Sequence, residues 1–158
     1  PFSPAGQRGD MRCGKRGCLE TGASGSAVYR IFMDKLAQNR VSMLSDKYNR
    51  GDKITLDDIL DALGQEDVLA IEVMENVGHT LGKALAGLIN LFNPDLIVLG
   101  GTLAVAKDYI MLPLKSAINK YSLQLVNKDT TIKLSKLGEK AGAVGACMLS
   151  RSKMLGLM

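Results

Sequence analysis

The stretch Asp95-Leu96-Ile97-Val98-Leu99-Gly100-Gly101-Thr102 decides the fold of this chain. Its apolar residues follow one another without alternation, which is typical of a strand buried on both faces of a parallel sheet. The glycines and the threonine then predict a tight turn that leads into a helix. Backbone amides and a helix N-terminus at the carboxyl end of such a strand suit an anion or a nucleotide, although paired glycines also simply make tight turns.

A long helical pattern precedes the strand. Apolar residues recur at helical spacing over Asp67 to Phe92, and Asn93-Pro94 predicts the end of this helix. Gly78 and Gly82 lie inside the pattern, where each glycine costs about 1 kcal/mol relative to alanine. We therefore expect a helix or a strand to approach the backbone closely at these two positions.

A helix, a strand and another helix are expected after the turn. The first helix runs from about Ala104 to Leu123, and Pro113 should kink or split it because proline lacks the amide donor. The β-branched residues of Thr130 to Leu134 predict a second strand, and Ala143 to Met154 predict a last helix. This alternation indicates an α/β fold in which long helices flank a short parallel sheet.

The N-terminal half is predicted to be mostly helical. An apolar stripe predicts one amphipathic helix from about Leu19 to Asn39, and Val41 to Lys53 is polar and turn-prone. In Thr55-Leu56-Asp57-Asp58 a threonine stands three residues before an acidic residue, which is the pattern of a helix N-cap. The short helix that follows should reach Leu63 and end at Gly64.

The composition is that of an ordinary globular protein. The chain has 158 residues, of which 46% are hydrophobic and 23% are charged, so one domain with a real core is expected. No apolar run approaches the roughly 20 residues that cross a bilayer. Residues 1–10 lack the basic and apolar regions of a signal peptide, which favours a soluble cytoplasmic protein without membrane contact. The net charge of +4 is spread along the chain, and this is more typical of a solvated face than of a nucleic-acid footprint.

Cysteines and a carboxylate gather near the N-terminus in Cys13-Gly14-Lys15-Arg16-Gly17-Cys18-Leu19-Glu20. Two thiols on a glycine-containing loop can face one metal ion, but two ligands do not complete a structural zinc site. Partly buried free thiols explain the pair equally well. Three cysteines in a chain without an export signal argue against a disulfide framework.

Several of these elements together resemble the ROK family of bacterial sugar kinases and NagC-like or Mlc-like sugar-responsive repressors. The resemblance rests on the cysteine segment, the Gly-Gly-Thr turn, Ser24-Gly25, Asn93-Pro94 and residues 138–146. The family motif CxCGxxGCxE is matched at Cys13, Gly14, Gly17, Cys18 and Glu20. The resemblance implies the C-terminal lobe of an actin-like ATPase fold, which is ribonuclease H-like, with sugar bound between two lobes.

On this resemblance the chain is a single C-terminal ROK fragment. Residues 1–18 form the cysteine-motif loop, residues 19–92 are mostly helical, and residues 93–158 form a βαβα half. Glu20 matches the family glutamate that binds sugar hydroxyls, which suits a carboxylate because it accepts two donors. Without the resemblance, Glu20 reads as a surface carboxylate near a helix start.

The resemblance also implies cofactors. Cys13 and Cys18 match zinc ligands of the family, but Met11 stands in place of the first cysteine, and a thioether is a poor zinc ligand. Gly100, Gly101 and Thr102 match the glycine turn that lies near ATP in the kinases, where Mg²⁺ would accompany it. Gly142 and Gly145 match the start of the last helix and are expected to allow close packing.

Two ligand-binding functions remain open, and the third possibility is a domain without a ligand. The first is the sugar-binding effector domain of a NagC-like repressor, which would contact DNA only through a domain absent from this chain. The second is the C-terminal lobe of a sugar kinase, although the phosphate loop and the catalytic aspartate of the kinases are not in these residues. The third is a plain interaction domain without a ligand. Family members commonly assemble, so a homo-oligomer is expected, and His79, the only histidine, is expected to be structural.

Overall fold

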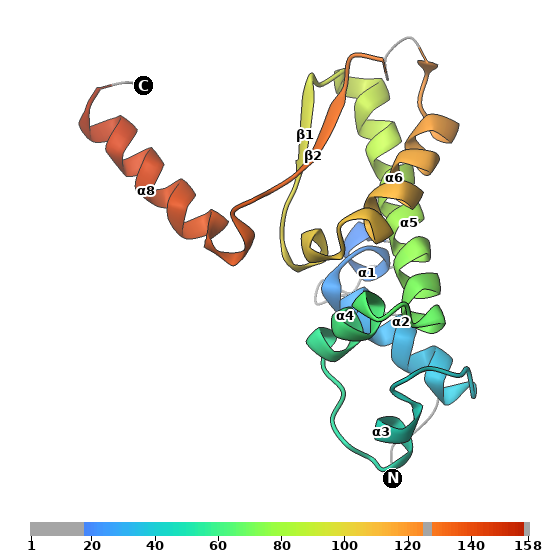
Figure 1. Ribbon diagram of the computed structural model, residues 1–158. Coiled ribbons are helices and arrows are strands. Elements are labelled where there is room, and N and C mark those ends of the chain that lie inside the picture. Colours follow the sequence, from blue (N-terminus) through green and yellow to red (C-terminus); the bar gives the residue numbers. More distant parts are fainter. Residues whose placement is uncertain (1–17, 125–127, 157–158) are drawn as a thin grey trace.

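The computed structural model describes residues 18–124 and 128–156, so the predictions that concern Met11 and Cys13 lie outside the described residues. The α-helices are α1 (Leu19–Gly22), α2 (Gly25–Ala37), α3 (Ser45–Asn49), α4 (Leu56–Gly64), α5 (Val68–Phe92), α6 (Asp108–Tyr121) and α8 (Ala141–Met154). The strands are β1 (Leu96–Leu99) and β2 (Thr131–Leu134), and the 3₁₀ helices are η1 (Thr102–Ala106) and η2 (Gly138–Lys140) (Figure 1). The expected order of elements is confirmed.

The strands β1 and β2 pair in parallel, with Leu96 opposite Thr131 and Leu99 opposite Leu134. One face of this sheet packs on α5 and α6, where Ile97 and Ile132 contact a buried apolar cluster. We expected β1 to be buried on both faces, and this is wrong, because the side chain of Leu96 is 50% exposed and that of Val98 is 56% exposed. The described helices cover one face of the two-stranded sheet, so alternate residues of β1 keep contact with solvent.

The helix α5 begins one residue after the expected start at Asp67 and ends at the expected residue, Phe92. Asp67 caps the N-terminus, because its carboxylate accepts the amide of Ala70 at 2.8 Å. Asn93 ends the helix in the left-handed conformation with φ 42°, which asparagine tolerates better than most residues. The predicted boundaries are therefore confirmed at both ends.

The close approach predicted at the two helix glycines is confirmed. A Cβ atom added to Gly78 would lie 2.8 Å from Cγ of Pro113 and 2.9 Å from the carbonyl oxygen of Ile110. One added to Gly82 would lie 2.8 Å from Cβ of Ala117. The two glycines thus let α6 pack directly on the backbone of α5, and the contact offsets their low helix propensity.

Three expectations about helices need correction. The expected helix over residues 19–39 is two helices, because Ser24 accepts the amide of Ala27 and caps a new start. The turn-prone segment after α2 contains the short helix α3. The sequence does not reveal this helix, because its five residues carry no apolar stripe. Pro113 lies inside a continuous α6, and the break falls earlier, at Lys107, where φ is 47° and ψ is −117°.

The last helix, α8, stands apart from the rest of the structure (Figure 1). None of its residues is buried. A Cβ atom added at Gly142 or Gly145 would meet nothing within 4 Å, so the expected close packing at these glycines is wrong for the described residues. In the described part of the chain, no helix is both long enough and apolar enough to cross a membrane.

Candidate functional site

A cavity of about 300 Å³ lies beside the turn that follows β1. Gly101 makes this turn with φ 82°, a conformation that favours glycine, and η1 begins directly after it. The lining residues come from five parts of the chain: Ala23, Gly25, Leu81, Val98, Leu99, Gly100, Gly101, Thr102, Leu103, Ala104, Ile110 and Leu134. The predicted ligand turn at Gly100 to Thr102 therefore forms one wall of a real cavity.

Another part of the lining, Ala23 and Gly25, comes from the corner between α1 and α2. The guanidinium of Arg30 donates to the carbonyl oxygen of Thr21 at 2.7 Å, and the hydroxyl of Ser24 donates to the carbonyl oxygen of Glu20 at 2.6 Å. These bonds hold α1 against the first turn of α2. A Cβ atom added to Gly25 would lie 2.8 Å from Cδ2 of Leu56, so a larger residue there would require the Leu56 side chain to shift.

Glu20 lies in the first turn of α1, close in sequence to this wall but outside the cavity lining. Its side chain is exposed, and within residues 18–124 and 128–156 it makes no hydrogen bond or ion pair. An exposed carboxylate with no internal partner keeps all its acceptor positions for a ligand. The structure thus brings the Gly-Gly-Thr turn to the cavity and places Glu20 at the adjoining corner.

The cavity wall is mainly apolar, with backbone groups of the turn as its polar part. Such a surface can pack against an apolar ring face and can hydrogen-bond through amides, but it contains no side-chain acid or base. General-base catalysis needs a carboxylate or an imidazole within hydrogen-bond reach of the substrate. His79 is outside the lining and packs edge-on against Tyr121, with ring centroids 5.8 Å apart.

The described residues do not complete a metal site around Cys18. Cys18 is the N-cap residue of α1 and is partly exposed. In the ranges that the structure describes, no three histidine, cysteine or acidic side chains form a group that could hold a metal ion. Met11, at the position of the first family cysteine, carries a thioether, which is a poor zinc ligand.

Sequence reasoning missed the cavity residues that come from the helices. Leu81 and Ile110 belong to apolar stripes, and nothing in their spacing separates a cavity wall from a packed core. Gly25 carried a signal, because it belongs to the Ser24-Gly25 pair quoted in the family resemblance. The close approach of Leu56 shows what this glycine does.

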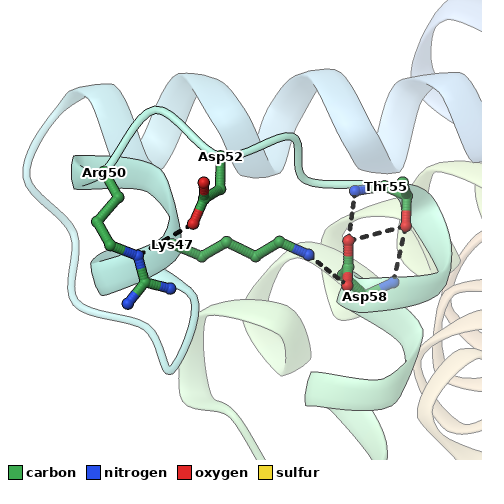
Figure 2. Close-up of polar contacts among 5 residues, drawn as sticks. All are labelled: Lys47, Arg50, Asp52, Thr55 and Asp58. Atoms are coloured by element: carbon green, nitrogen blue, oxygen red, sulfur yellow. Dashed lines mark hydrogen bonds and ion pairs between the residues drawn. The ribbon is translucent and has the colours of Figure 1, made fainter.

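The helix that carries Leu56 is fixed by a capping box, shown in Figure 2. The carboxylate of Asp58 accepts hydrogen bonds from the backbone amide of Thr55 at 2.7 Å and from the Thr55 hydroxyl at 2.8 Å. In return, the Thr55 hydroxyl oxygen accepts a hydrogen bond from the backbone amide of Asp58 at 3.2 Å. Lys47 donates to the other oxygen of Asp58 at 2.8 Å. The hydrogen bonds from Lys47 and then from Thr55 lower the pKa of Asp58 from 3.8 to about 2.

This shift predicts a pH dependence of stability. A carboxyl group with a lowered pKa in the folded state stabilises the fold fully above its unfolded pKa of 3.8, and loses this effect as the pH falls through about 2. We expect the melting temperature of the wild type to exceed that of Asp58→Asn at pH 6. The difference should shrink between pH 4 and pH 2, as followed by circular dichroism. A difference that stays constant over this range would contradict the assignment.

The chain is similar to both regulators and kinases. The ROK family profile matches residues 2–153. The sequence is 35% identical to the DNA-binding transcriptional dual regulator NagC of Escherichia coli over 96% of this chain and 36% of that protein. It is 33% identical to a glucokinase of Halalkalibacterium halodurans over 89% of this chain and 43% of that protein.

The structure leads to the same family. It matches the ROK family glucokinase of Streptomyces griseus, solved with glucose and AMPPNP, with a TM-score of 0.75 and 27% identity. The match covers 89% of this chain and 46% of that one. The chain therefore spans less than half the length of each of these three proteins.

Proposed function

Because the chain belongs to the ROK family, we propose that it is the sugar-binding effector part of a NagC-like transcriptional regulator. The regulator and the glucokinase resemble it almost equally, so similarity alone does not choose between them. The replacement of a family cysteine by Met11 favours the regulator, because an altered metal site is easier to tolerate without catalysis. In such a regulator, sugar binding would shift the position of a DNA-binding domain.

The observation that supports the proposal is a cavity lined by the predicted glycine turn and by residues that follow Glu20 closely in the chain. The turn at Gly100 to Thr102 lines the cavity, and so do Ala23 and Gly25, the first of which comes three residues after Glu20. A sugar hydroxyl array needs exposed acceptors, and the carboxylate of Glu20 has no internal partner among the described residues. Glu20 is therefore proposed as the sugar-binding side chain.

The alternative is the C-terminal lobe of an ATP-dependent sugar kinase. The apolar cavity beside the glycine turn favours it, because this turn matches the family position near ATP. In that case Gly100, Gly101 and Thr102 would face the nucleotide through their backbone amides, and Mg²⁺ would accompany the phosphates. The catalytic base would have to come from residues outside this chain.

Calorimetry with sugars tests the proposal. The protein is titrated with N-acetylglucosamine, glucose and xylose, and one of them is expected to bind with measurable heat. Glu20→Ala should weaken that binding at least tenfold, about 1.4 kcal/mol, because a charge-assisted hydrogen bond is lost. Glu75→Ala is the matched control, since Glu75 is also an exposed helical carboxylate and lies outside the cavity lining.

Two results would overturn the proposal. The absence of heat with every sugar, or unchanged affinity in Glu20→Ala, would favour an interaction domain without a sugar ligand. Sugar-dependent consumption of ATP by the protein would instead favour the kinase. A regulator is expected to bind the sugar and to leave ATP unchanged.

A further inference from the structure

The helical turn that carries Glu20 depends on contacts from other elements. α1 has four residues, and none of them is buried. Isolated helices shorter than about 12 residues are marginal in water, so this turn is not stable by itself. The position of Glu20 is therefore set by the groups that hydrogen-bond to α1 and pack against it.

Two side chains from the α2 region bond to the end of α1. A helix leaves its last carbonyl oxygens without partners inside the helix. The hydroxyl of Ser24 donates to the carbonyl oxygen of Glu20 at 2.6 Å. Nη2 of Arg30 donates to the carbonyl oxygen of Thr21 at 2.7 Å. Ser24 is the N-cap residue of α2 and Arg30 lies within it, so donors from α2 fix the main chain at Glu20.

Arg30 is oriented by a second partner. Its Nη1 lies 3.7 Å from Oδ2 of Asp34, one turn further along α2. The guanidinium is planar and its donors have a fixed geometry, so one nitrogen faces Asp34 while Nη2 reaches the carbonyl oxygen of Thr21. Arg30 therefore connects α1 to the body of α2 in one defined arrangement.

A single hydroxyl connects Glu20 to the first turn of α2. A hydroxyl has one hydrogen to donate and two lone pairs with which to accept. That of Ser24 donates to the carbonyl oxygen of Glu20 and accepts the amide of Ala27 at 3.2 Å. The hydroxyl of Ser26 lies 2.8 Å away and supplies the second hydrogen bond that Ser24 accepts. The group that caps α2 thereby also fixes the turn before it.

α1 also lies against α5 (Figure 1). A Cβ atom added to Gly22 would lie 3.2 Å from Cγ2 of Thr80, which is closer than ordinary van der Waals contact. Packing at one glycine does not set the orientation of a helical turn. The orientation of α1 is therefore set by the hydrogen bonds from Ser24 and Arg30.

We propose that Arg30 and Ser24 are positioning residues for sugar binding: they hold the turn of α1 so that the carboxylate of Glu20 stands where it accepts the sugar hydroxyls. This inference rests on the proposed function, in which Glu20 binds the sugar. When only a fraction of the molecules has a binding group in place, the apparent dissociation constant rises by the inverse of that fraction. The loss of either bond should therefore weaken sugar binding, although neither side chain lines the cavity.

Calorimetry of Arg30 variants, with the sugar that the wild type binds, tests the bond to Thr21. Arg30→Met keeps the aliphatic stem and removes every donor, so the sugar should bind about fivefold to tenfold more weakly. Arg30→Lys keeps a cationic donor and should recover part of the affinity. Arg50→Met is the matched control and should bind like the wild type, because Arg50 also pairs with one aspartate, at 3.0 Å, and lies outside the cavity lining. Circular dichroism checks that each variant is folded.

Ser24 variants separate the cap of α2 from the bond to Glu20. Ser24→Asp keeps an acceptor for the Ala27 amide, but an ionised carboxylate cannot donate to the carbonyl oxygen of Glu20. Its melting temperature should stay close to that of the wild type, while its affinity for the sugar falls by about the same factor as in Arg30→Met. Ser24→Thr keeps both bonds and should bind the sugar like the wild type. Wild-type affinity in Ser24→Asp overturns the role of Ser24.

A double-mutant cycle shows whether Arg30 acts through Glu20. If it does, Arg30→Met causes no further loss of affinity in a protein that already carries Glu20→Ala. A further loss of the same size, or wild-type affinity in Arg30→Met alone, overturns the inference. Wild-type affinity in Glu20→Ala, or no binding of any sugar, overturns the proposed function and this inference with it. The two failures are distinguishable, because the first leaves the effect of Glu20→Ala intact.

Discussion

Gly82→Ala is expected to lower the free energy of unfolding by about 1–2 kcal/mol. The new Cβ atom would overlap the carbonyl oxygen of Leu114 and would lie 2.8 Å from Cβ of Ala117. These neighbours belong to the packed face of α6, so the helices must move apart, and overpacking of this kind costs about 1–3 kcal/mol or more. The gain in helix propensity of about 1 kcal/mol offsets only part of the cost. Urea unfolding followed by circular dichroism measures the difference.

Gly87→Ala is the matched control for this experiment. Gly87 lies in the same helix, and a Cβ atom added there would meet nothing within 4 Å. The substitution should therefore raise stability by about 1 kcal/mol through helix propensity alone. If Gly82→Ala also raised stability, the close contact between α5 and α6 would be wrong.

Asp67→Ala is expected to cost about 2–4 kcal/mol. The loss of the N-cap of α5 removes about 0.5–2 kcal/mol, and the amide of Met43 loses its acceptor in a partly buried place, which costs about 1–3 kcal/mol. Thermal unfolding at neutral pH measures the sum. The backbone at Met43 should also loosen, since Asp67 is the acceptor of its amide.

Asp67→Asn separates the two contributions. An asparagine side chain keeps one acceptor oxygen for the Ala70 amide, but its amide nitrogen cannot accept the hydrogen bond from Met43. The stability of Asp67→Asn should therefore lie between that of the wild type and that of Asp67→Ala. Equal losses in the two variants would show that the hydrogen bond from Met43 alone carries the effect.

Much of the fold could be predicted because its signals are local. The α5 boundaries follow from Asp67 and Asn93, and the capping box at Thr55 and Asp58 fixes α4, since each pattern satisfies backbone groups within a few residues. The split of the first expected helix was missed because the apolar stripe continues across Ser24. The exposure of Val98 was missed because an apolar run does not tell how many faces of a sheet are covered.

The candidate site could be predicted only in part. The turn at Gly100 to Thr102 could be predicted because a glycine pair directly after an apolar strand indicates a tight turn at the carboxyl end of a sheet, where ligands bind in α/β folds. Leu81 and Ile110 were not found, since they join the cavity only where α5 and α6 meet the turn. The bond from Arg30 to α1 had no sequence signal at all, because the spacing of α2 does not show which of its polar side chains reaches back along the chain.

By itself the sequence determined the family, the main helices, the parallel strands and the need for contact at Gly78 and Gly82. Each of these follows from residues that are neighbours in the chain or along one helix, where spacing sets geometry. The tertiary structure alone decided that α6 supplies that contact, that the α1–α2 corner and the glycine turn line one cavity, and that α1 lies against α5. These are contacts between distant segments, and they depend on how several helices pack at once, which no local pattern specifies.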